Sequence, residues 1–176
     1  MSDWIKAINP MATIGTEAEA LRAARASAIA IFIGVAFGIV GVVVMMNGGM
    51  EAMQSAVAAQ SAGADAQVAS MTGAIVEFTL YMMIAMVVIQ LILGFVQWVK
   101  PNLVIPILFI VLVVYGLGST LLGQVMAGQM DVPETAMNTA WMTALGIAVM
   151  VIELMLHIAG VRGASALRKF RDAQAY

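Results

Sequence analysis

Four long apolar runs dominate the pattern of hydrophobic and polar positions along this chain. They cover about residues 27–46, 73–99, 103–122 and 137–161. A transmembrane helix needs roughly 20 consecutive apolar residues, and each run meets that length. Strands and buried helices of water-soluble domains give shorter runs or alternate with polar positions. The pattern therefore predicts an all-α polytopic membrane protein, whose four transmembrane helices form an up-and-down bundle with an interfacial N-terminal segment.

Residues 1–25 carry the signals of a cytoplasmic, interfacial N-terminal segment. Residues 3–9 place Trp4 and two isoleucines on one side of a short helix, which suits a position in the headgroup region. Further on, Thr16 is followed three residues later by Glu19, which is the spacing of a capping box. This spacing predicts that the first long helix begins in water, at Thr16, before it enters the membrane.

The other two parts of the chain are a membrane domain, residues 26–161, and a cytoplasmic basic tail, residues 162–176. Within the membrane domain, Lys100-Pro101-Asn102 is the whole connection between the second and third apolar runs. So short a turn predicts that these two helices run antiparallel as close neighbours.

Small residues recur at every fourth position along the first apolar run, at Ala30, Gly34 and Gly38. Residues with this spacing share one helix face, and their small side chains allow another helix backbone to approach closely. We interpret this stripe as a helix-packing face. Its partner is either another helix of this chain or a helix of a different protein.

The positive charges follow the same four-crossing arrangement. If the chain crosses the membrane four times, every lysine and arginine falls on one side, and the two connections on the other side have none. The eight residues are Lys6, Arg22, Arg25, Lys100, Arg162, Arg168, Lys169 and Arg171. Lysine and arginine near helix ends are retained on the cytoplasmic side of a membrane. We therefore expect both termini in the cytoplasm and the chain in an inner (plasma) membrane of bacterial type.

Composition excludes several classes of function. Hydrophobic residues make up 62% of the chain and charged residues only 10%, which is too apolar for a water-soluble domain. Without cysteine there are no disulfides, thiolate metal sites or thiol nucleophiles, and no basic patch of the nucleic-acid-binding kind occurs. A single histidine cannot provide two axial haem ligands, and neither a Ser/His/Asp set nor a phosphate-binding loop occurs. We expect no catalytic residues, no metal site and no cofactor.

Glu153 and His157 are the sharpest candidates for a functional site. They stand four residues apart in the fourth apolar run, so a helix places both on one face inside the membrane. A carboxylate at the bilayer centre costs roughly 2.5 to 3.5 kcal/mol on insertion scales, so the bundle has to supply a partner, a proton or water. One interpretation is a proton relay or gate in which the two groups titrate together. The other is structural, with His157 near the headgroups and in contact with a shielded Glu153.

Two weaker candidates lie in the second apolar run. Glu77 is about one turn from the outer end of that run, where its carboxylate can reach the interface. Gln90 lies deeper, where an amide either hydrogen-bonds another helix, a contact worth ~0.6 to 2 kcal/mol, or marks a polar pathway. Both residues join Glu153 and His157 in a candidate intramembrane polar site.

Sixteen methionines raise the question of copper, because thioethers are soft ligands that select Cu(I). Met50 and Met53 follow the outer end of the first run, and the pair Met82-x-x-x-Met86 with Gly34-x-x-x-Gly38 resembles the eukaryotic high-affinity copper transporters. The chain departs from them in having four crossings rather than three, a glycine motif on an earlier helix, and no histidine or cysteine on the outer face. It is not assigned to that family, and methionine also fills gaps in apolar interfaces.

Short extramembrane parts, little polar lining and several faces suited to close helix contact favour a non-catalytic accessory or structural subunit. Such a subunit belongs to a larger inner-membrane complex, for example an energy-transducing one. Its expected partners are the lipid bilayer and other integral membrane subunits, with no nucleic acid. The alternative is a small homo-oligomeric transporter or channel that moves protons or a cation past Glu153 and His157. Copper handling through outer-face methionines is the third hypothesis.

Overall fold

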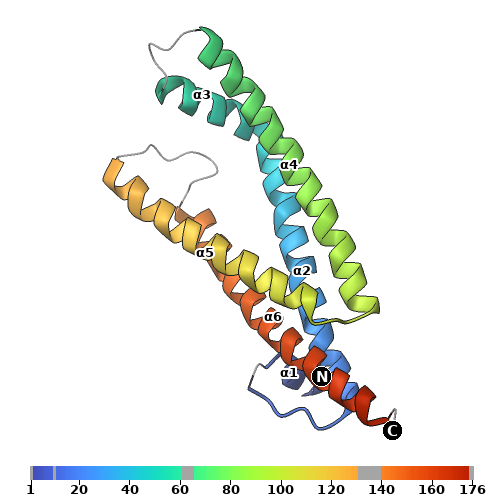
Figure 1. Cartoon of the computed structure of the whole chain (residues 1–176). Coiled ribbons are helices and arrows are strands. Elements are labelled where there is room, and N and C mark those ends of the chain that lie inside the picture. Colours follow the sequence, from blue (N-terminus) through green and yellow to red (C-terminus); the bar gives the residue numbers. More distant parts are fainter. Residues whose placement is uncertain (1, 10, 61–65, 131–139, 175–176) are drawn as a thin grey trace.

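The computed structural model describes residues 2–9, 11–60, 66–130 and 140–174, and these ranges contain helices but no strand (Figure 1). The elements are α1 (Ser2–Ile8), α2 (Glu17–Val44), the π-helical turn η1 (Met45–Gly49), α3 (Met50–Gln60), α4 (Ala66–Val99), α5 (Val104–Met130) and α6 (Ala140–Gln174). Four of them, α2, α4, α5 and α6, are long and apolar enough to cross a membrane. The predicted all-α architecture with four membrane-crossing helices is confirmed. The first residues of the fourth apolar run, 137–139, lie outside the described ranges.

Several helices extend beyond the apolar runs that predicted them. α2 begins at Glu17, before its apolar run, and α6 continues past Val161 as far as Gln174. The added sequence is rich in alanine, arginine, lysine and leucine, which have high helix propensity. The basic tail is therefore a straight continuation of the last membrane helix.

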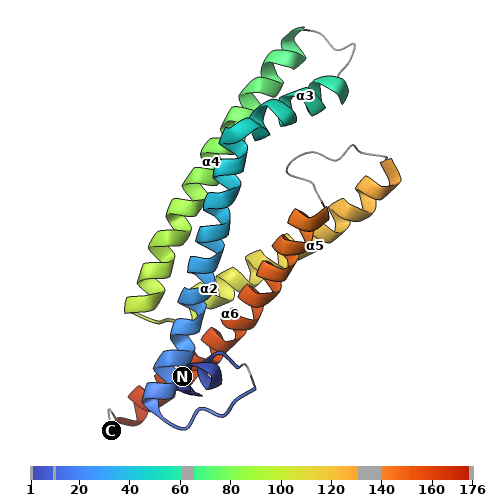
Figure 2. The ribbon, with the colours of Figure 1, turned by 180° about the vertical axis from the view of Figure 1, so that it is seen from behind.

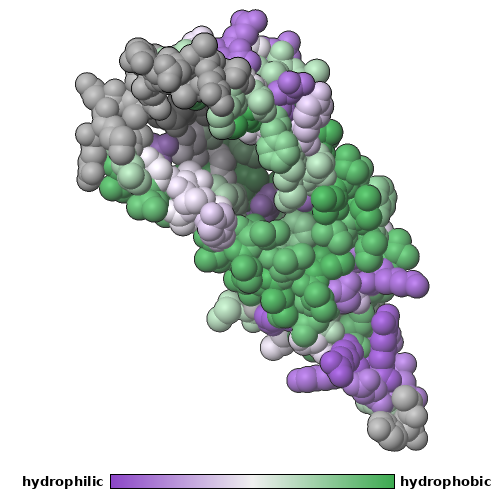
Figure 3. Space-filling view, turned by 45° about the horizontal axis from the view of Figure 1, so that its top comes forward, coloured by the Kyte–Doolittle hydropathy of each residue, from purple (hydrophilic) through white to green (hydrophobic). Residues whose placement is uncertain are grey.

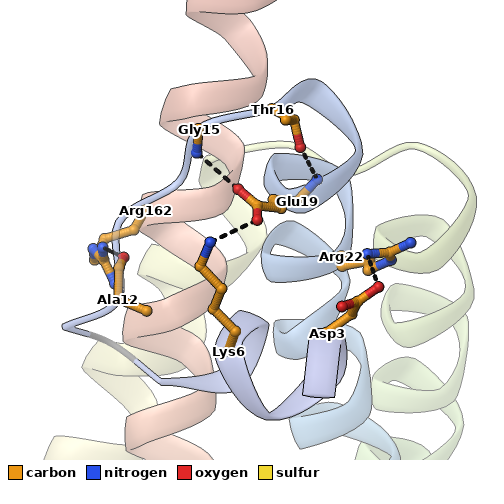
Figure 4. A network of polar contacts seen from close by, with 8 residues as sticks. All are labelled: Asp3, Lys6, Ala12, Gly15, Thr16, Glu19, Arg22 and Arg162. Atoms are coloured by element: carbon orange, nitrogen blue, oxygen red, sulfur yellow. Dashed lines mark hydrogen bonds and ion pairs between the residues drawn. The ribbon is translucent and has the colours of Figure 1, made fainter. Parts of the chain in front are cut away.

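The first turn of α2 forms as the capping box predicts. The Thr16 hydroxyl oxygen accepts a hydrogen bond from the Glu19 amide at 3.2 Å. The Glu19 carboxylate in turn accepts hydrogen bonds from the Lys6 ammonium at 2.6 Å and the Gly15 amide at 2.8 Å (Figure 4). These bonds, the one from Lys6 foremost, lower the pKa of the Glu19 carboxyl below its ordinary value. Glu19 thus joins α1 to the start of α2.

Two further contacts hold the N-terminal segment against the bundle. Asp3 pairs with Arg22 of α2, with 3.0 Å between the carboxylate oxygen and the guanidinium nitrogen (Figure 4). The Arg162 guanidinium of α6 donates hydrogen bonds to the backbone oxygens of Asn9 and Ala12. The segment is therefore folded onto α2 and α6, at the end of the molecule that also carries the C-terminus (Figure 1).

At its other end α2 passes into η1, where the chain turns sharply. Asn47 and Gly48 leave the helical conformation there, and Gly48 has a φ of 100°, which glycine adopts readily and L side chains rarely do. The Asn47 side-chain amide donates a hydrogen bond to the Val43 carbonyl oxygen at 2.8 Å. The turn directs α3 to a position against α4.

The four long helices form two arms that meet at one end and diverge toward the other (Figures 1 and 2). α2 packs against α4 in one arm, α5 packs against α6 in the other, and α2 crosses α6 where the arms meet. We call this the joined end and the opposite one the open end. α4 and α5 separate from the turn at residues 100–103, so the prediction that they are close neighbours is wrong.

Side chains of α2 explain why α4 and α5 do not pack along each other. Ile105 and Phe109 of α5 belong to one buried cluster with Ile31 of α2. On α4, a Cβ at Gly94 would lie only 2.8 Å from the Phe32 ring, so this glycine lets α4 approach α2 closely. Both helices therefore bury their joined ends against α2 rather than against each other.

The lysines and arginines of the sequence all belong to the joined end. They lie in α1, in the first turns of α2, in the turn at residues 100–103 and in the last turns of α6. Figure 3 shows hydrophilic surface gathered at this end, next to a broad hydrophobic band. The positive charges that the sequence places on one side of the membrane therefore all lie at one end of the bundle, the joined end.

Candidate functional site

The site is built on a close crossing of α2 and α6. A Cβ added to Gly163 would overlap the backbone nitrogen of Ala24, and one added to Gly160 would lie 2.5 Å from the Ser27 Cβ. Such spacing brings one helix backbone directly against another, which only glycine allows at these positions. Because no space remains between the helices here, the crossing closes the bundle toward the joined end.

The small-residue stripe of α2 continues this interface toward the open end. Ala30 belongs to a buried cluster with Leu156 and Ala159 of α6. Further along, a Cβ at Gly34 would lie 2.7 Å from a carboxylate oxygen of Glu153, and one at Gly38 would lie 2.8 Å from a methyl group of Val87 on α4. The stripe therefore contacts α6 and α4 of this chain, which answers the question of its partner that the sequence left open.

Glu153 and Gln90 face the same point on α2 from different helices. The Glu153 carboxylate oxygen and the Gln90 carboxamide oxygen lie 2.7 and 3.8 Å from the position that a Cβ of Gly34 would occupy. Among the described residues, no ion pair or hydrogen bond of the Glu153 side chain is found. Two oxygen acceptors without a positive partner therefore lie close together in the membrane interior.

His157 is fully buried one turn further toward the joined end. Its Nδ1 lies 2.8 Å from the Ser27 hydroxyl oxygen, and its ring stacks on Phe109 with 5.3 Å between the ring centroids. Its Nε2 is buried and has no hydrogen-bond partner in the described part of the chain. The expected contact of His157 with Glu153 is not found in the described part of the chain, where Ser27 is the hydrogen-bond partner instead. The position of His157 relative to the headgroups stays a prediction.

Two adjoining cavities connect these polar groups. One, of about 290 Å³, is bordered by residues of all four long helices, including Gln90, Phe109, Glu153 and His157. The other, of about 310 Å³, shares Glu153, Gln90 and Gly34 with the first and extends along α2 and α4 toward the open end. Figure 3 looks into the open end and shows a hollow between the arms with hydrophilic surface inside it. A water molecule occupies about 30 Å³ in the liquid, so there is room for several.

The structure brings three of the four predicted polar residues together and leaves the fourth apart. Glu153, His157 and Gln90 border the first cavity, whereas Glu77 is exposed on α4 and accepts a hydrogen bond from the Tyr81 hydroxyl at 3.1 Å. Sequence reasoning missed Ser27. The only signal was a hydroxyl on the small-residue face of the first run, and nothing in the sequence paired it with His157.

A second buried polar group fixes the joined end. The Gln97 side-chain amide donates to the backbone oxygens of Ala24 at 3.3 Å and Asn102 at 3.2 Å, and its carbonyl accepts from the Asn102 amide at 3.2 Å. Beside it, Arg25 donates to the Trp98 backbone oxygen at 3.2 Å and lies 5.1 Å from that ring's centroid. These contacts tie α2 to the end of α4 and to the turn into α5.

No group of three or more His, Asp or Glu side chains that could hold a metal ion occurs among the described residues. Met50 and Met53, the methionines named for copper, are half-buried in α3. Copper binding by them stays a prediction.

We compared the chain with protein families, curated proteins and solved structures. No protein-family model matches the chain, and neither a curated protein nor a solved structure matches it.

Proposed function

We propose that this chain is a non-catalytic subunit of a larger inner-membrane complex, such as an energy-transducing one, with both termini in the cytoplasm. The observation that carries the proposal is that the long helices are buried to very different extents by the rest of the chain. Only 6% of the most apolar stretch of α4 is buried, compared with 28% for the corresponding stretch of α6. α4 packs against α2 and the short α3 and leaves most of its surface to its surroundings.

The opening between the arms gives further support. Glu153 and Gln90 border cavities that face this opening, and each keeps part of its surface exposed. Hydrocarbon cannot hydrogen-bond a carboxylate or an amide, whereas a helix of another protein can cover both groups and supply partners. The position of these two side chains therefore favours a partner helix in the opening over lipid alone.

Covalent capture in native membranes tests this proposal. The chain has no cysteine, so single-cysteine variants can carry a photoreactive cross-linker at one chosen position. Met86 borders both cavities, so Met86→Cys places the cross-linker next to them. Val88 is two residues, or about half a helical turn, further on, so Val88→Cys places it on the opposite side of α4. We expect Met86→Cys to capture one defined membrane protein that Val88→Cys does not.

Native mass measurement after gentle solubilisation is the independent readout. It should show the same captured protein bound to the unmodified chain. A stable monomer, together with the absence of any protein adduct at Met86→Cys, would contradict the proposal.

A separate observation favours the alternative function, a small homo-oligomeric transporter or channel for protons or a cation. Glu153 has no positive partner among the described residues, and Gln90 and His157 add two further polar groups to the same cavity. A buried carboxylate is stabilised by a proton or a bound cation when the protein supplies no counter-charge. The cavity is thus suited to hold one of them next to Glu153.

The geometry also suggests the direction of access. The cavities face the open end, and the α2–α6 crossing at Gly163 closes the other side. His157 can accept a proton at Nε2 and release the proton on Nδ1 to the Ser27 hydroxyl oxygen, and this hydroxyl then releases its own proton at the edge of that crossing. Full passage then requires the crossing to loosen.

Flux measurements in liposomes test the transport alternative. Glu153→Gln keeps the size of the side chain and removes its charge, so we expect it to abolish proton or cation flux while the protein still assembles. Glu77→Gln makes the same change outside the cavity and should leave flux unchanged. Unaltered flux in Glu153→Gln would rule out this function.

A further inference from the structure

The helical tail has one face that neither proposed function uses. Arg162, Ser165 and Lys169 follow one another at intervals of three and four residues along α6, so they share a side of the helix. With Ile14, from the segment before α2, they border a cavity of about 630 Å³, larger than either cavity beside Glu153. The remaining wall of the cavity is made by Val161, Ala166, Phe170 and Ala173.

The cations of the tail differ in their partners. Arg168 pairs with Asp172 and Arg171 with Glu17, each with 3.9 Å between nitrogen and oxygen. Lys169 borders the cavity, and none of the ion pairs in the described part of the chain involves it. The cavity therefore combines apolar walls with a positive charge that no acidic side chain compensates.

The cavity spans the level at which α6 leaves the apolar region. Arg162 directly follows the last apolar run, and Lys169 lies seven residues, or about 10 Å, further along the helix axis. The headgroup layer of one leaflet is roughly 5 to 7 Å thick, and a lysine side chain is long enough to reach back to it. By this spacing Val161 lies at the end of the apolar run, and the Lys169 ammonium can reach the level expected for lipid phosphates.

We propose that this cavity binds one anionic phospholipid. The phosphate accepts hydrogen bonds from the Lys169 ammonium and the Ser165 hydroxyl, and an acyl chain lies over Ile14 and Val161. The net negative charge of the lipid complements the uncompensated ammonium. Each cation near an anionic membrane surface is worth about fivefold in affinity, so this charge favours anionic over zwitterionic lipid.

Native mass spectrometry of the full chain tests the proposal, with phosphatidylglycerol or phosphatidylcholine of identical acyl chains added to the detergent. We expect one phosphatidylglycerol molecule to be retained in preference to phosphatidylcholine. Lys169→Gln should weaken its binding about fivefold. The matched control, Arg168→Gln, removes the same charge from the adjacent residue outside the cavity and should leave binding unchanged.

Two further variants keep the test independent of charge. Ala166→Trp fills the cavity and should abolish retention of the lipid. Ser165→Ala removes one hydrogen-bond donor without adding bulk, so we expect binding to weaken roughly two- to tenfold. Circular dichroism of each variant checks that the helices still form.

Three results would overturn the proposal. Equal weakening by Lys169→Gln and Arg168→Gln would reduce the effect to general attraction between the tail and anionic lipid. Retention that Ala166→Trp leaves intact would place the lipid elsewhere. A dimer that Ala166→Trp disrupts without any change in lipid binding would show that a second copy of this chain occupies the cavity.

Discussion

The two ends of this bundle are held in different ways. At the joined end, glycines of α6 contact the backbone of α2, the buried Gln97 bonds two other segments, and α1 is fastened by ion pairs. At the open end, α4 and α5 diverge and leave Glu153 and Gln90 facing cavities. The difference shows that close backbone contact and buried polar bonds, rather than apolar surface, decide where membrane helices stay together. Apolar surface gives a helix little preference for another helix, because lipid covers it equally well.

The largest expected effect comes from breaking the joined end at its closest contact. Gly163→Ala places a Cβ against the Ala24 backbone. A side chain could rotate away from the added methyl group, but the backbone cannot. We expect a loss of unfolding free energy at or above the roughly 1 to 3 kcal/mol typical of overpacking. Unfolding in mixed micelles, followed by circular dichroism, measures it.

The matched control for that substitution is Gly118→Ala on α5. Apart from the neighbouring backbone of its own helix, a Cβ there would have no described atom within 4 Å, so the change should be neutral or stabilise the helix by about 0.5 to 1 kcal/mol. Equal destabilisation by both substitutions would show that the α2–α6 crossing is not what holds the joined end.

A smaller effect is expected at the polar contact beside the crossing. Gln97→Leu keeps the approximate volume of the side chain but leaves the Asn102 amide without its acceptor. The unsatisfied group should cost roughly 1 to 3 kcal/mol of unfolding free energy. Hydrogen exchange should rise at the turn at residues 100–103 and stay unchanged in α3. Faster exchange throughout the chain would contradict a local role for Gln97.

The smallest effect concerns the docking of α1, which is fastened by exposed ion pairs. Because the pKa of Glu19 is lowered in the folded protein, its bond to Lys6 stabilises docking above the ordinary carboxyl pKa. That contribution is lost as the pH falls below about 4.5 and through the lowered value. Hydrogen exchange in α1 should therefore rise in acid. Lys6→Met should weaken this pH dependence, and an undiminished dependence in that variant would contradict the assignment.

Much of the fold could be predicted because its causes are local in the sequence. The length of each apolar run gives a crossing, the Thr16 to Glu19 spacing gives the start of α2, and the distribution of cations separates the two ends. The pairing of Glu153 and His157 on one face follows from helical spacing alone. These features need no knowledge of what each helix packs against.

The remaining features depend on contacts between distant segments. The divergence of α4 and α5 arises from α2 side chains that lie between their joined ends, and the short turn gives no sign of it. The bond between His157 and Ser27 joins residues 130 positions apart. Glycine spacing marks a face that allows close approach, but it does not say which helix approaches.

The contrast between the ends can be measured most directly by spin-label distances in nanodiscs, using the cysteine-free chain as background. One labelled pair, Ile75→Cys with Leu122→Cys, reports on α4 and α5 at the open end, and Val99→Cys with Val104→Cys reports on the same helices at the joined end. All four positions are exposed. The structure predicts a clearly longer distance at the open end than at the joined end. Equally short distances at both ends would show that α4 and α5 pack along their whole length and would contradict the two-arm bundle.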